Sequence, residues 1–199
     1  NYLDHAEEAG LPAPTEPVLF IKACTLTGPD DDIQFPATST KLDWEIELAI
    51  VVGRRALNIS REQAADHIAG YATFIDLSAR DWQLERGGNW DKGKSYPGFA
   101  PIGPWLRPAS EVDEGALGLT LSVNGKTMQD GNTGKMIFPP DVVLSYLSEF
   151  IELMPGDVIA TGTPAGVGMG LKPPIYLEGG DRIVAEVTGL GAQHHLCRR

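Results

Sequence analysis

The sequence predicts a β-rich α+β fold with a few short helices. The 199 residues include 23 glycines and 15 prolines, which divide the chain into many short apolar runs. Runs of this kind, bounded by turn-forming residues, are typical of strands, whereas a clear helical spacing of apolar residues occurs in two segments. In the second half of the chain the runs follow one another as consecutive strands, which disfavours a doubly wound parallel sheet.

Six runs have the composition of strands, and two segments have the spacing of helices. The predicted strands cover residues 18–23, 44–53, 70–78, 117–125, 157–163 and 181–189. The first predicted helix covers residues 60–70, with Ser60 as its N-cap and Gly70 as its end. The second covers residues 139–153, which begin with prolines and continue with apolar residues three and four positions apart.

The composition indicates a single domain over residues 1–199 and excludes two kinds of partner. A hydrophobic content of 42% in a chain of this length is enough for one sizeable core. The formal net charge of −11 disfavours nucleic-acid binding, which needs clustered basic residues. No apolar run approaches the roughly 20 residues of a membrane span. Cys24 and Cys197 lack the spacing of a disulfide framework or zinc knuckle, so we expect a cytoplasmic location.

Two glutamates lie inside the predicted strand 44–53. Residues two apart in a strand point to the same face, so Glu45 and Glu47 project together, away from the apolar residues beside them. One interpretation is an ordinary strand with one solvated face. The other is a metal site, because crowded carboxylates repel unless a hard cation such as Mg²⁺ lies between them. The spacing alone leaves both interpretations open.

A third carboxylate favours the metal site. Asp76 ends the apolar run "GYATFID", where its alternative role is to cap the following turn. If this strand neighbours strand 44–53, three carboxylates converge and leave coordination positions for water and substrate. Arg80 and Gln83 follow Asp76 by four and seven residues, so a helical turn would place them on the same side, and we expect them to bind the substrate.

Motifs in order along nearly the whole chain resemble the fumarylacetoacetate hydrolase family. They are "NYLDHAEEAG", "DWEIELAIVVG", "GYATFIDLSARDWQ", "WDKGKSYPGFAPIGPW", "VNGKTMQDGNTGKMIF" and "MPGDVIATGTPAGVG". The resemblance implies the β-roll catalytic fold of that family and a homodimer. It also implies that Glu45, Glu47 and Asp76 are metal ligands, with Mg²⁺ as the expected cation and Mn²⁺ or Ca²⁺ as alternatives.

The first motif matches the family pattern N-Y-x-x-H-x-x-E at Asn1, Tyr2, His5 and Glu8. In the family this segment often forms a mobile lid over the substrate, which implies a lid in residues 1–16. The histidine and the acid lie on one helical turn, where the carboxylate can orient the imidazole and raise its basicity. The resemblance therefore makes His5 the base that activates water and Glu8 its partner, whereas a terminal histidine alone would be a surface residue.

The resemblance also assigns roles to two lysines and a threonine. Lys94, in "DKGKSYPGF", is expected near the metal as a catalytic cation that stabilises negative charge in the transition state. Lys22 is expected to bind the substrate, with a snorkelling strand residue as the alternative. Thr163, in "TGTPAGVG", is expected to hold the substrate carboxylate together with nearby backbone N–H groups.

Two departures from the family pattern concern the surroundings of these residues. The family commonly has asparagine before the metal-binding aspartate, where this chain has Ile75, and often Asp-Thr-Phe where it has Pro97-Gly98-Phe99. Neither change removes an expected ligand. Both alter the hydrogen bonds around the ligands and the shape of the substrate pocket, so the substrate is not carried over from the family.

The implied function is the metal-dependent hydrolysis of a carbon–carbon bond in a 2,4-dioxo acid, which yields pyruvate and a second acid. The motifs look most like bacterial members that act on 2,4-dioxo-3-deoxy sugar acids or acylpyruvates. The same scaffold serves decarboxylation of 2-oxo acids and isomerisation of 2-hydroxydienedioates, and both are alternatives. A metal-binding scaffold without turnover is a further alternative, which the intact His5–Glu8 pair and three carboxylates disfavour.

Three other segments are assigned no catalytic function. The acidic run at residues 28–33 is typical of a solvated loop, and "HHLC" at residues 194–197 of a C-terminal tail without enough ligands for zinc. The glycine-rich residues 161–170 lack the ending of a phosphate-binding loop, and we expect them to supply backbone N–H donors.

Overall fold

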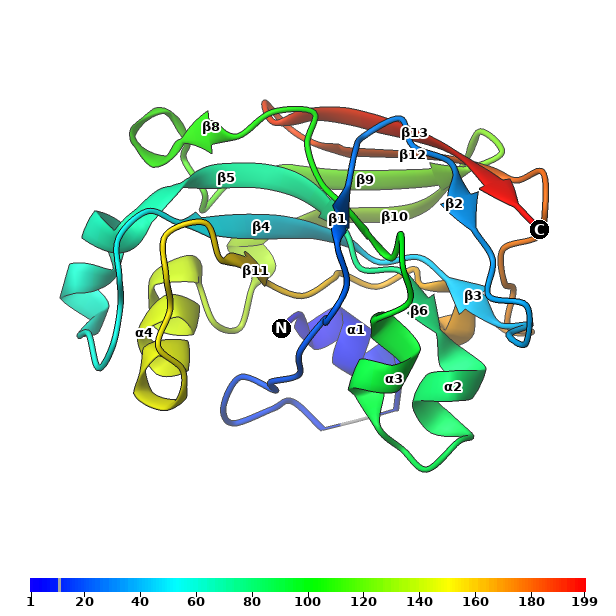
Figure 1. Cartoon of the computed structure of the whole chain (residues 1–199), viewed down its shortest axis with the longest axis horizontal. Coiled ribbons are helices and arrows are strands. Elements are labelled where there is room, and N and C mark those ends of the chain that lie inside the picture. Colours follow the sequence, from blue (N-terminus) through cyan, green and yellow to red (C-terminus); the bar gives the residue numbers. More distant parts are fainter. Residues whose placement is uncertain (11) are drawn as a thin grey trace.

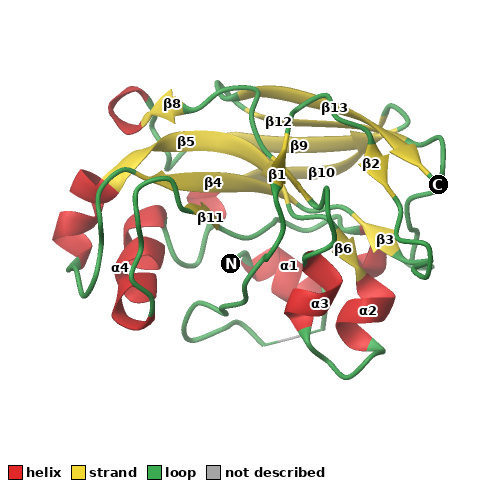
Figure 2. Cartoon of the chain, in the orientation of Figure 1, coloured by secondary structure: helices red, strands yellow, loops and turns green. Residues whose placement is uncertain are grey.

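The computed structural model describes residues 1–10 and 12–199 and has the strand-rich α+β fold with few short helices that the sequence predicts (Figure 2). The strands are β1 (Leu26–Thr27), β2 (Ile33–Gln34), β3 (Leu42–Asp43), β4 (Ile46–Val52), β5 (Ile68–Ile75), β6 (Ser78–Ala79), β7 (Ala100–Pro101), β8 (Arg107–Pro108), β9 (Gly118–Val123), β10 (Lys126–Asn132), β11 (Val158–Ala160), β12 (Arg182–Val187) and β13 (Gly191–Arg198). The α-helices are α1 (Leu3–Glu8), α2 (Arg80–Leu84), α3 (Trp90–Lys94) and α4 (Pro140–Phe150). The 3-10 helices are η1 (Arg61–His67), η2 (Ala109–Glu111), η3 (Thr133–Lys135) and η4 (Gly168–Gly170).

Two sheets form the body of the molecule (Figure 1). The larger sheet has the strand order β10, β9, β12, β13 and β2, and its strands are antiparallel except where β2 joins β13 in parallel. The second sheet has the order β11, β4, β5 and β8 and is antiparallel throughout. The short pairs β1–β7 and β3–β6 complete the described strands. None of the described helices is long and apolar enough to span a membrane.

The two faces of β4 have different environments. Alternate side chains of this strand enter the main core and meet apolar residues of β9 and β12 there. The main core includes Ile46, Leu48, Ile50, Leu119, Leu121, Ile183 and Ala185. The opposite face carries Glu47 and Ala49, beside Ala72 and Phe74 of β5. The alternation therefore places a carboxylate on the face that points away from the main core.

Five of the six predicted strands are confirmed. The runs 44–53, 70–78, 117–125, 157–163 and 181–189 overlap β4, β5, β9, β11 and β12. The second predicted helix is confirmed as α4, which has proline at its first position.

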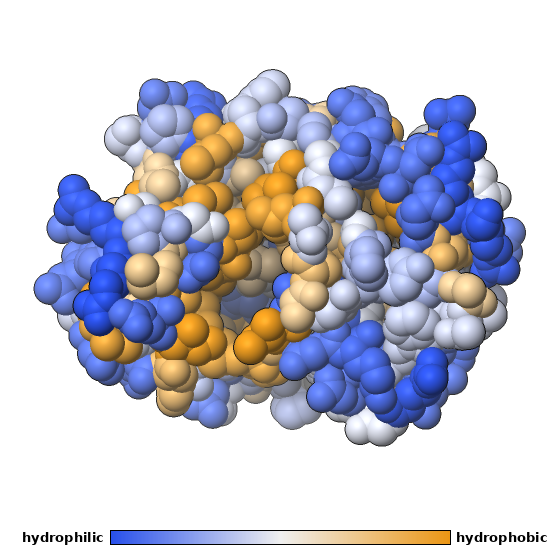
Figure 3. Space-filling view, viewed as in Figure 1, coloured by the Kyte–Doolittle hydropathy of each residue, from blue (hydrophilic) through white to orange (hydrophobic). Residues whose placement is uncertain are grey.

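The surface drawn in Figure 3 is hollowed near its centre, and apolar side chains surround the hollow.

The strand predicted over residues 18–23 is wrong. The segment forms no strand. Two of its backbone amides donate to side chains, one in α3 and one directly after α3. The Ile21 amide donates to Asp91 Oδ1 at 3.0 Å, and the Ala23 amide donates to Ser95 Oγ at 2.9 Å. An apolar run does not reveal which groups will take its backbone hydrogen bonds, so the sequence could not exclude this arrangement.

The first predicted helix begins as expected but ends earlier. Ser60 and Gln63 form a capping box at the start of η1, which ends at His67. Gly70, predicted to end the helix, lies inside β5, where an added Cβ would collide with the carbonyl group of Arg107 in β8. This glycine permits a close approach of two strands and does not end a helix.

The predicted C-terminal tail is also wrong, because residues 194–197 belong to β13. Gln193, His195 and Cys197 alternate as buried residues along this strand. His195 Nε2 lies 2.9 Å from Gln193 Oε1, and Gln193 Nε2 donates to the Thr73 carbonyl at 2.8 Å. The inward side chains of Gln193 and His195 are polar, and they are buried because they form hydrogen bonds within the protein. The alternation of β13 could therefore not be recognised from hydropathy.

Candidate active site

Glu45, Glu47 and Asp76 converge at one end of the β4–β5 pair. The Asp76 amide donates to the Glu45 carbonyl at 2.8 Å, which extends the antiparallel ladder by one residue. Residues opposite each other on such a ladder share a face. The three side chains are buried, and each offers an oxygen within 4.8 Å of those offered by the other two. The two strands are neighbours, which meets the condition set by the sequence, and the three acids form a possible divalent metal site.

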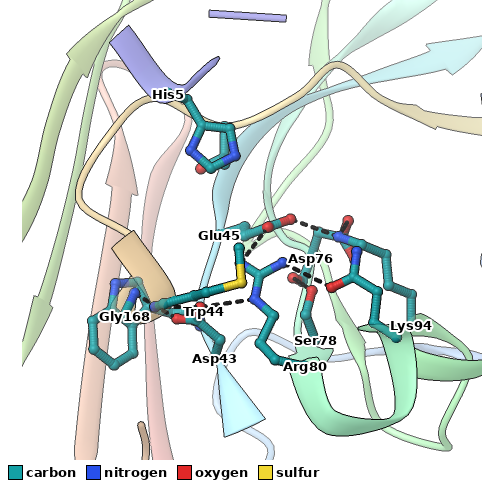
Figure 4. A network of polar contacts seen from close by, with 12 residues as sticks. His5, Asp43, Trp44, Glu45, Asp76, Ser78, Arg80, Lys94 and Gly168 are labelled. Carbon is teal, nitrogen blue, oxygen red and sulfur yellow. Dashed lines mark hydrogen bonds and ion pairs between the residues drawn. The ribbon is translucent and has the colours of Figure 1, made fainter. Parts of the chain in front are cut away.

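Two buried cations lie against these carboxylates (Figure 4). Lys94 Nζ is 2.6 Å from Glu45 Oε2 and 2.5 Å from Asp76 Oδ2. Arg80 Nη2 is 2.6 Å from Glu45 Oε1. Burial alone would raise the pKa of Glu45, but the charges of Arg80 and Lys94 outweigh burial and hold the pKa below its usual value. Glu45 is therefore held in its ionised form, which is the form that binds a metal ion.

Glu47 has a different environment from the other two acids. Its Oε2 accepts a hydrogen bond from the Gly162 amide at 2.6 Å. Burial, together with the negative charges of Asp76 and Glu45, raises the pKa of Glu47 to about 8. A divalent cation among these oxygens would relieve the repulsion and keep Glu47 ionised. Carboxylate oxygens are the ligands that Mg²⁺ and Mn²⁺ prefer.

The charges around the site also fit a divalent cation. The cluster contains one more carboxylate than cationic group, and its members are Asp43, Glu45, Glu47, Asp76, Lys22, Arg80 and Lys94. A divalent ion would reverse the sign of this balance, and the site would then attract an anionic substrate. The side chains present therefore suit a metal centre that works on a carboxylate-bearing molecule.

Arg80 and Gln83 lie together on α2, as the sequence predicts. Both are 3% exposed, and Arg80 Nη1 donates to Gln83 Oε1 at 3.0 Å. Helix α3 packs closely here, because an added Cβ at Gly93 would lie 2.6 Å from Gln83 Cβ. These contacts hold the guanidinium group of Arg80 beside the carboxylates. Substrate binding by the two side chains stays a prediction.

His5 and Glu8 lie on α1, and Figure 4 shows His5 on the side of Glu45 that faces this helix. His5 Nδ1 is 3.4 Å from Glu8 Oε2, which confirms the expected contact. Because the carboxylate accepts, we assign the proton to Nδ1, and Nε2 then keeps a lone pair. Glu8 is itself held by the Gly166 amide, which lies 3.0 Å from Oε1 and 3.1 Å from Oε2. The pair therefore has the geometry of an oriented base, and its catalytic role stays a prediction.

The mobile lid expected in residues 1–16 also stays a prediction, and residue 11 lies outside the described residues. Asn1 is firmly tied, because its side-chain amide donates to the carbonyl groups of Phe138 and Thr161, each at 2.8 Å. In contrast, α1 buries none of its residues. A tethered start followed by a helix outside the core is consistent with movement about Asn1.

Lys22 uses its donors within the protein. Its ammonium group donates to Asp76 Oδ1 at 2.7 Å and to the carbonyl groups of Leu77 at 2.9 Å and Lys94 at 2.5 Å. An ammonium group has three donors, so this set is complete. The contacts favour a role in positioning Asp76, and substrate binding by Lys22 stays a prediction.

Thr163 is likewise engaged with neighbouring groups. Its hydroxyl donates to the Ile46 carbonyl at 2.8 Å and accepts from Gln129 Nε2 at 2.7 Å. Gln129 also accepts from the Ile46 amide at 2.9 Å and donates to the Pro164 carbonyl at 2.8 Å. The buried amide of Gln129 thus fixes the loop after β11 against β4. Substrate binding by Thr163 stays a prediction.

Two residues that organise the site, Gln129 and Asp43, are not among those predicted from the sequence. Gln129 lies in the polar run of β10 and carries no signal in the sequence. Asp43 is 0% exposed, and its carboxylate accepts from Arg80 Nε at 2.8 Å. Its position directly before the buried Trp44 is a signal that could have identified it, because a charge in an apolar segment needs partners.

Known proteins resemble this chain over most or all of its length. A protein of Burkholderia multivorans named "Putative hydrolase" is 49% identical over an alignment of 201 positions, which covers 100% of this chain and 71% of that protein. The crystal structure of 2-hydroxyhepta-2,4-diene-1,7-dioate isomerase from Mycobacterium marinum has a TM-score of 0.84 and 38% identity, covering 94% of this chain and 71% of that one. Fumarylpyruvate hydrolase from Pseudomonas aeruginosa, solved with Mn²⁺ and pyruvate, has a TM-score of 0.88 and 34% identity. This match covers 100% of this chain and 86% of that one.

The family described as fumarylacetoacetate (FAA) hydrolase C-terminal matches residues 1–196. This match spans nearly the whole chain and accompanies a strand-rich fold with a buried acidic triad. The chain therefore belongs to the fumarylacetoacetate hydrolase C-terminal family.

Proposed function

We propose that the protein is a divalent-metal-dependent hydrolase that cleaves a carbon–carbon bond in a 2,4-dioxo acid and releases pyruvate. The observation that carries this proposal is that His5, which contacts Glu8, faces Glu45 of the three buried carboxylates. Hydrolysis requires both a base for water and a means of stabilising negative charge on the departing carbon fragment. Further support comes from the fumarylpyruvate hydrolase with Mn²⁺ and pyruvate, which is similar over the whole chain.

Glu45, Glu47 and Asp76 would hold the cation. When bound, it supplies Lewis-acid polarisation of a substrate carbonyl and stabilises the charge that develops there. Lys94 adds a second positive group beside the same carboxylates. Burial would lower the pKa of Lys94, but Asp76 and Glu45 outweigh burial and raise it, so the ammonium form persists at neutral pH.

In the proposed hydrolysis His5 takes up one proton and later returns it. His5 Nε2 takes a proton from water as the water oxygen bonds to the fourth carbon of the substrate, and Glu8 stabilises the imidazolium. The bond between the third and fourth carbons then breaks, and its electron pair passes to the third carbon, where the adjacent carbonyl delocalises the charge. His5 returns its proton to that carbon. The products are pyruvate and the acid formed from the fourth carbon.

Arg80, Gln83, Thr163 and Lys22 are proposed to bind or orient the substrate. Arg80 is 3% exposed and carries a permanent charge, which suits a carboxylate or a developing oxyanion. Because Lys22 and Thr163 already bond to neighbouring groups, their contribution would be to hold the substrate-facing groups in place.

Isomerisation of a 2-hydroxydienedioate is the second candidate reaction. It is favoured by the isomerase from Mycobacterium marinum, which is 38% identical to this chain. Isomerisation of such an enol moves the proton of the 2-hydroxyl group to a carbon of the chain and consumes no water, so His5 would act only as a proton carrier. Decarboxylation of a 2-oxo acid is a third use of the same charge-stabilising groups.

A substrate panel tests the proposal. The protein is incubated with acylpyruvates, fumarylpyruvate, a 2,4-dioxo-3-deoxy sugar acid, oxaloacetate and a 2-hydroxydienedioate, with Mg²⁺ or Mn²⁺ and then with EDTA. Pyruvate release and loss of the dioxo absorbance are followed. In H₂¹⁸O, hydrolysis places one ¹⁸O atom in the second acid, whereas isomerisation of the dienedioate does not. Absence of any metal-dependent cleavage of dioxo acids would refute the hydrolase proposal.

A His5→Gln variant tests the base separately from the metal site. We expect hydrolysis to fall by at least about 100-fold, because general base catalysis typically contributes that much. Mg²⁺ affinity measured by calorimetry should stay within twofold, and His67→Gln, which alters a histidine of η1, is the matched control. Turnover equal to that of the unchanged protein would remove His5 from the mechanism.

A further inference from the structure

We propose that Asp43 is a positioning residue that holds Arg80 and the Glu8 seat in one arrangement. The Glu8 seat is the glycine-rich loop of residues 166–170, on which the carboxylate of Glu8 rests. The inference rests on the proposed function for the catalytic purpose of Glu8. It adds a physical link between Arg80, the proposed substrate-binding arginine, and the proposed lid helix.

Both oxygens of Asp43 have two partners. Oδ1 accepts from the amides of Trp44 at 2.8 Å and Gly168 at 2.7 Å. Oδ2 accepts from Arg80 Nε at 2.8 Å and from the Met169 amide at 2.9 Å. A fully buried carboxylate is costly unless its oxygens are satisfied in this way. Oδ1 therefore joins the Glu8 seat to Trp44, which precedes β4, and Oδ2 joins it to Arg80 at the start of α2.

Trp44 supports the other end of the seat. Its indole Nε1 donates to the Gly166 carbonyl at 3.0 Å, while the Gly166 amide donates to Glu8. The consecutive residues Asp43 and Trp44 thus hydrogen-bond to three residues of the seat, Gly166, Gly168 and Met169. In the motif "DWEIE", the first two residues hold the seat and the two glutamates face the metal site.

The glycines of the seat are required by close contacts. An added Cβ at Gly170 would collide with the carboxylate of Glu8, and one at Gly168 would lie 2.8 Å from Asp43 Oδ1. Gly166 has a φ of +103°, in the region that favours glycine. The Glu8 side chain therefore lies directly against the backbone of the loop.

The seat is important for α1 because this helix buries none of its residues. Its start is fixed through Asn1, and its end is held by the bonds from the Gly166 amide to Glu8. If the seat shifts, the end of α1 loses its attachment, and His5 loses the carboxylate that orients it. Asp43 thus acts on the proposed base through the loop, without touching it.

Hydrogen exchange measured by mass spectrometry on the full chain tests this inference without any substrate. Trp44→Phe removes the indole bond to Gly166, and Gly170→Ala places a methyl group where Glu8 lies. We expect amide exchange in residues 1–10 to rise about threefold or more in both variants, since one hydrogen bond contributes about 1 kcal/mol. Exchange in β9 and β12 should stay unchanged.

Two matched variants act as controls on α2. Trp82→Phe removes an indole bond to the Thr38 carbonyl, and Asp81→Asn alters a carboxylate that bonds to Ser39 and Thr40. Neither should change exchange in residues 1–10. Asp43→Asn should increase exchange in residues 1–10, 80–84 and 166–170 together, because the new amide would face two donors.

A double-variant comparison separates positioning from general loss of structure. In a Glu8→Gln background, where the seat has lost its charged partner, Trp44→Phe should add little to the exchange of residues 1–10. The inference is overturned if Trp44→Phe and Gly170→Ala leave residues 1–10 at the exchange rate of the unchanged protein. It is equally overturned if exchange rises to the same extent in β9 and β12. Since no turnover is measured, failure of the substrate panel would be a separate result.

Discussion

The ammonium group of Lys94 lies 2.6 Å from Glu45 Oε2, inside the group of carboxylates that would hold a divalent cation. The same nitrogen lies 2.5 Å from Asp76 Oδ2. Lys94 would therefore share two acidic partners with a bound cation. This arrangement reduces the negative charge available to the cation while keeping a positive group for an anionic substrate.

Replacing Lys94 by methionine should separate these two effects. Loss of the nearby positive charge should raise Mg²⁺ affinity by about threefold to tenfold, because like charges in a buried site repel. Turnover on any substrate that the panel identifies should fall by about 100-fold or more, since a charge-stabilising group is lost. Calorimetry and steady-state kinetics measure the two quantities, with the exposed Lys135→Met as the control. Weaker Mg²⁺ binding by Lys94→Met would contradict the assigned charge balance.

Replacing Glu47 by glutamine should weaken metal binding. The substitution removes the charge of one of the three expected oxygen ligands, and we expect Mg²⁺ affinity to fall by at least about tenfold. Calorimetric titration measures the affinity, and Glu186→Gln on the exposed face of β12 provides a matched control. An affinity equal to that of the unchanged protein would show that Glu47 is not a ligand.

Replacing Tyr2 by phenylalanine should leave the fold intact or stabilise it. Tyr2 is 1% exposed, and among the described residues its hydroxyl is a buried side-chain group without a hydrogen-bond partner. Removing such a group recovers its desolvation cost, so we expect the free energy of unfolding to change by between zero and about +2 kcal/mol. Urea unfolding measures the change, with Tyr176→Phe as the control. A clear loss of stability would indicate a partner, such as an ordered water molecule.

The thiol of Cys197 should resist alkylation in the folded protein. Burial raises the pKa of Cys197 to about 12, and the reactive species is the thiolate. In a Cys24→Ser variant at pH 8, iodoacetamide should label Cys197 slowly until urea unfolds the chain. The folded pKa exceeds the unfolded value, so this thiol contributes stability below about pH 8.5. That contribution is lost as the pH rises toward 12.

Rapid labelling of Cys197 at pH 8, at the rate of the unfolded chain, would contradict its place in β13. That outcome would instead suit the tail that the sequence suggested. The control is the same reaction on the chain in urea, where both arrangements predict full labelling.

Elements with a clear alternation or helical spacing could be predicted from the sequence. The strand around Glu45 and Glu47 and helix α4 both have one apolar face, which is visible in the order of the residues. Strand β13 was missed because Gln193 and His195 are polar and buried together. The segment 18–23 was wrongly predicted because its backbone bonds to side chains beside α3.

The sequence by itself determined which residue types the site contains, and its motifs showed the likeness to one family. It also determined that Glu45 and Glu47 share a face, because residues two apart in a strand point the same way. Only the tertiary structure decided that Asp76 lies opposite Glu45 and that Lys94 lies between them. It also decided that Asp43 holds the seat of Glu8, whose loop lies more than 100 residues away in the chain. Such contacts depend on how strands pair and loops close, and these are properties of the whole fold that local spacing does not contain.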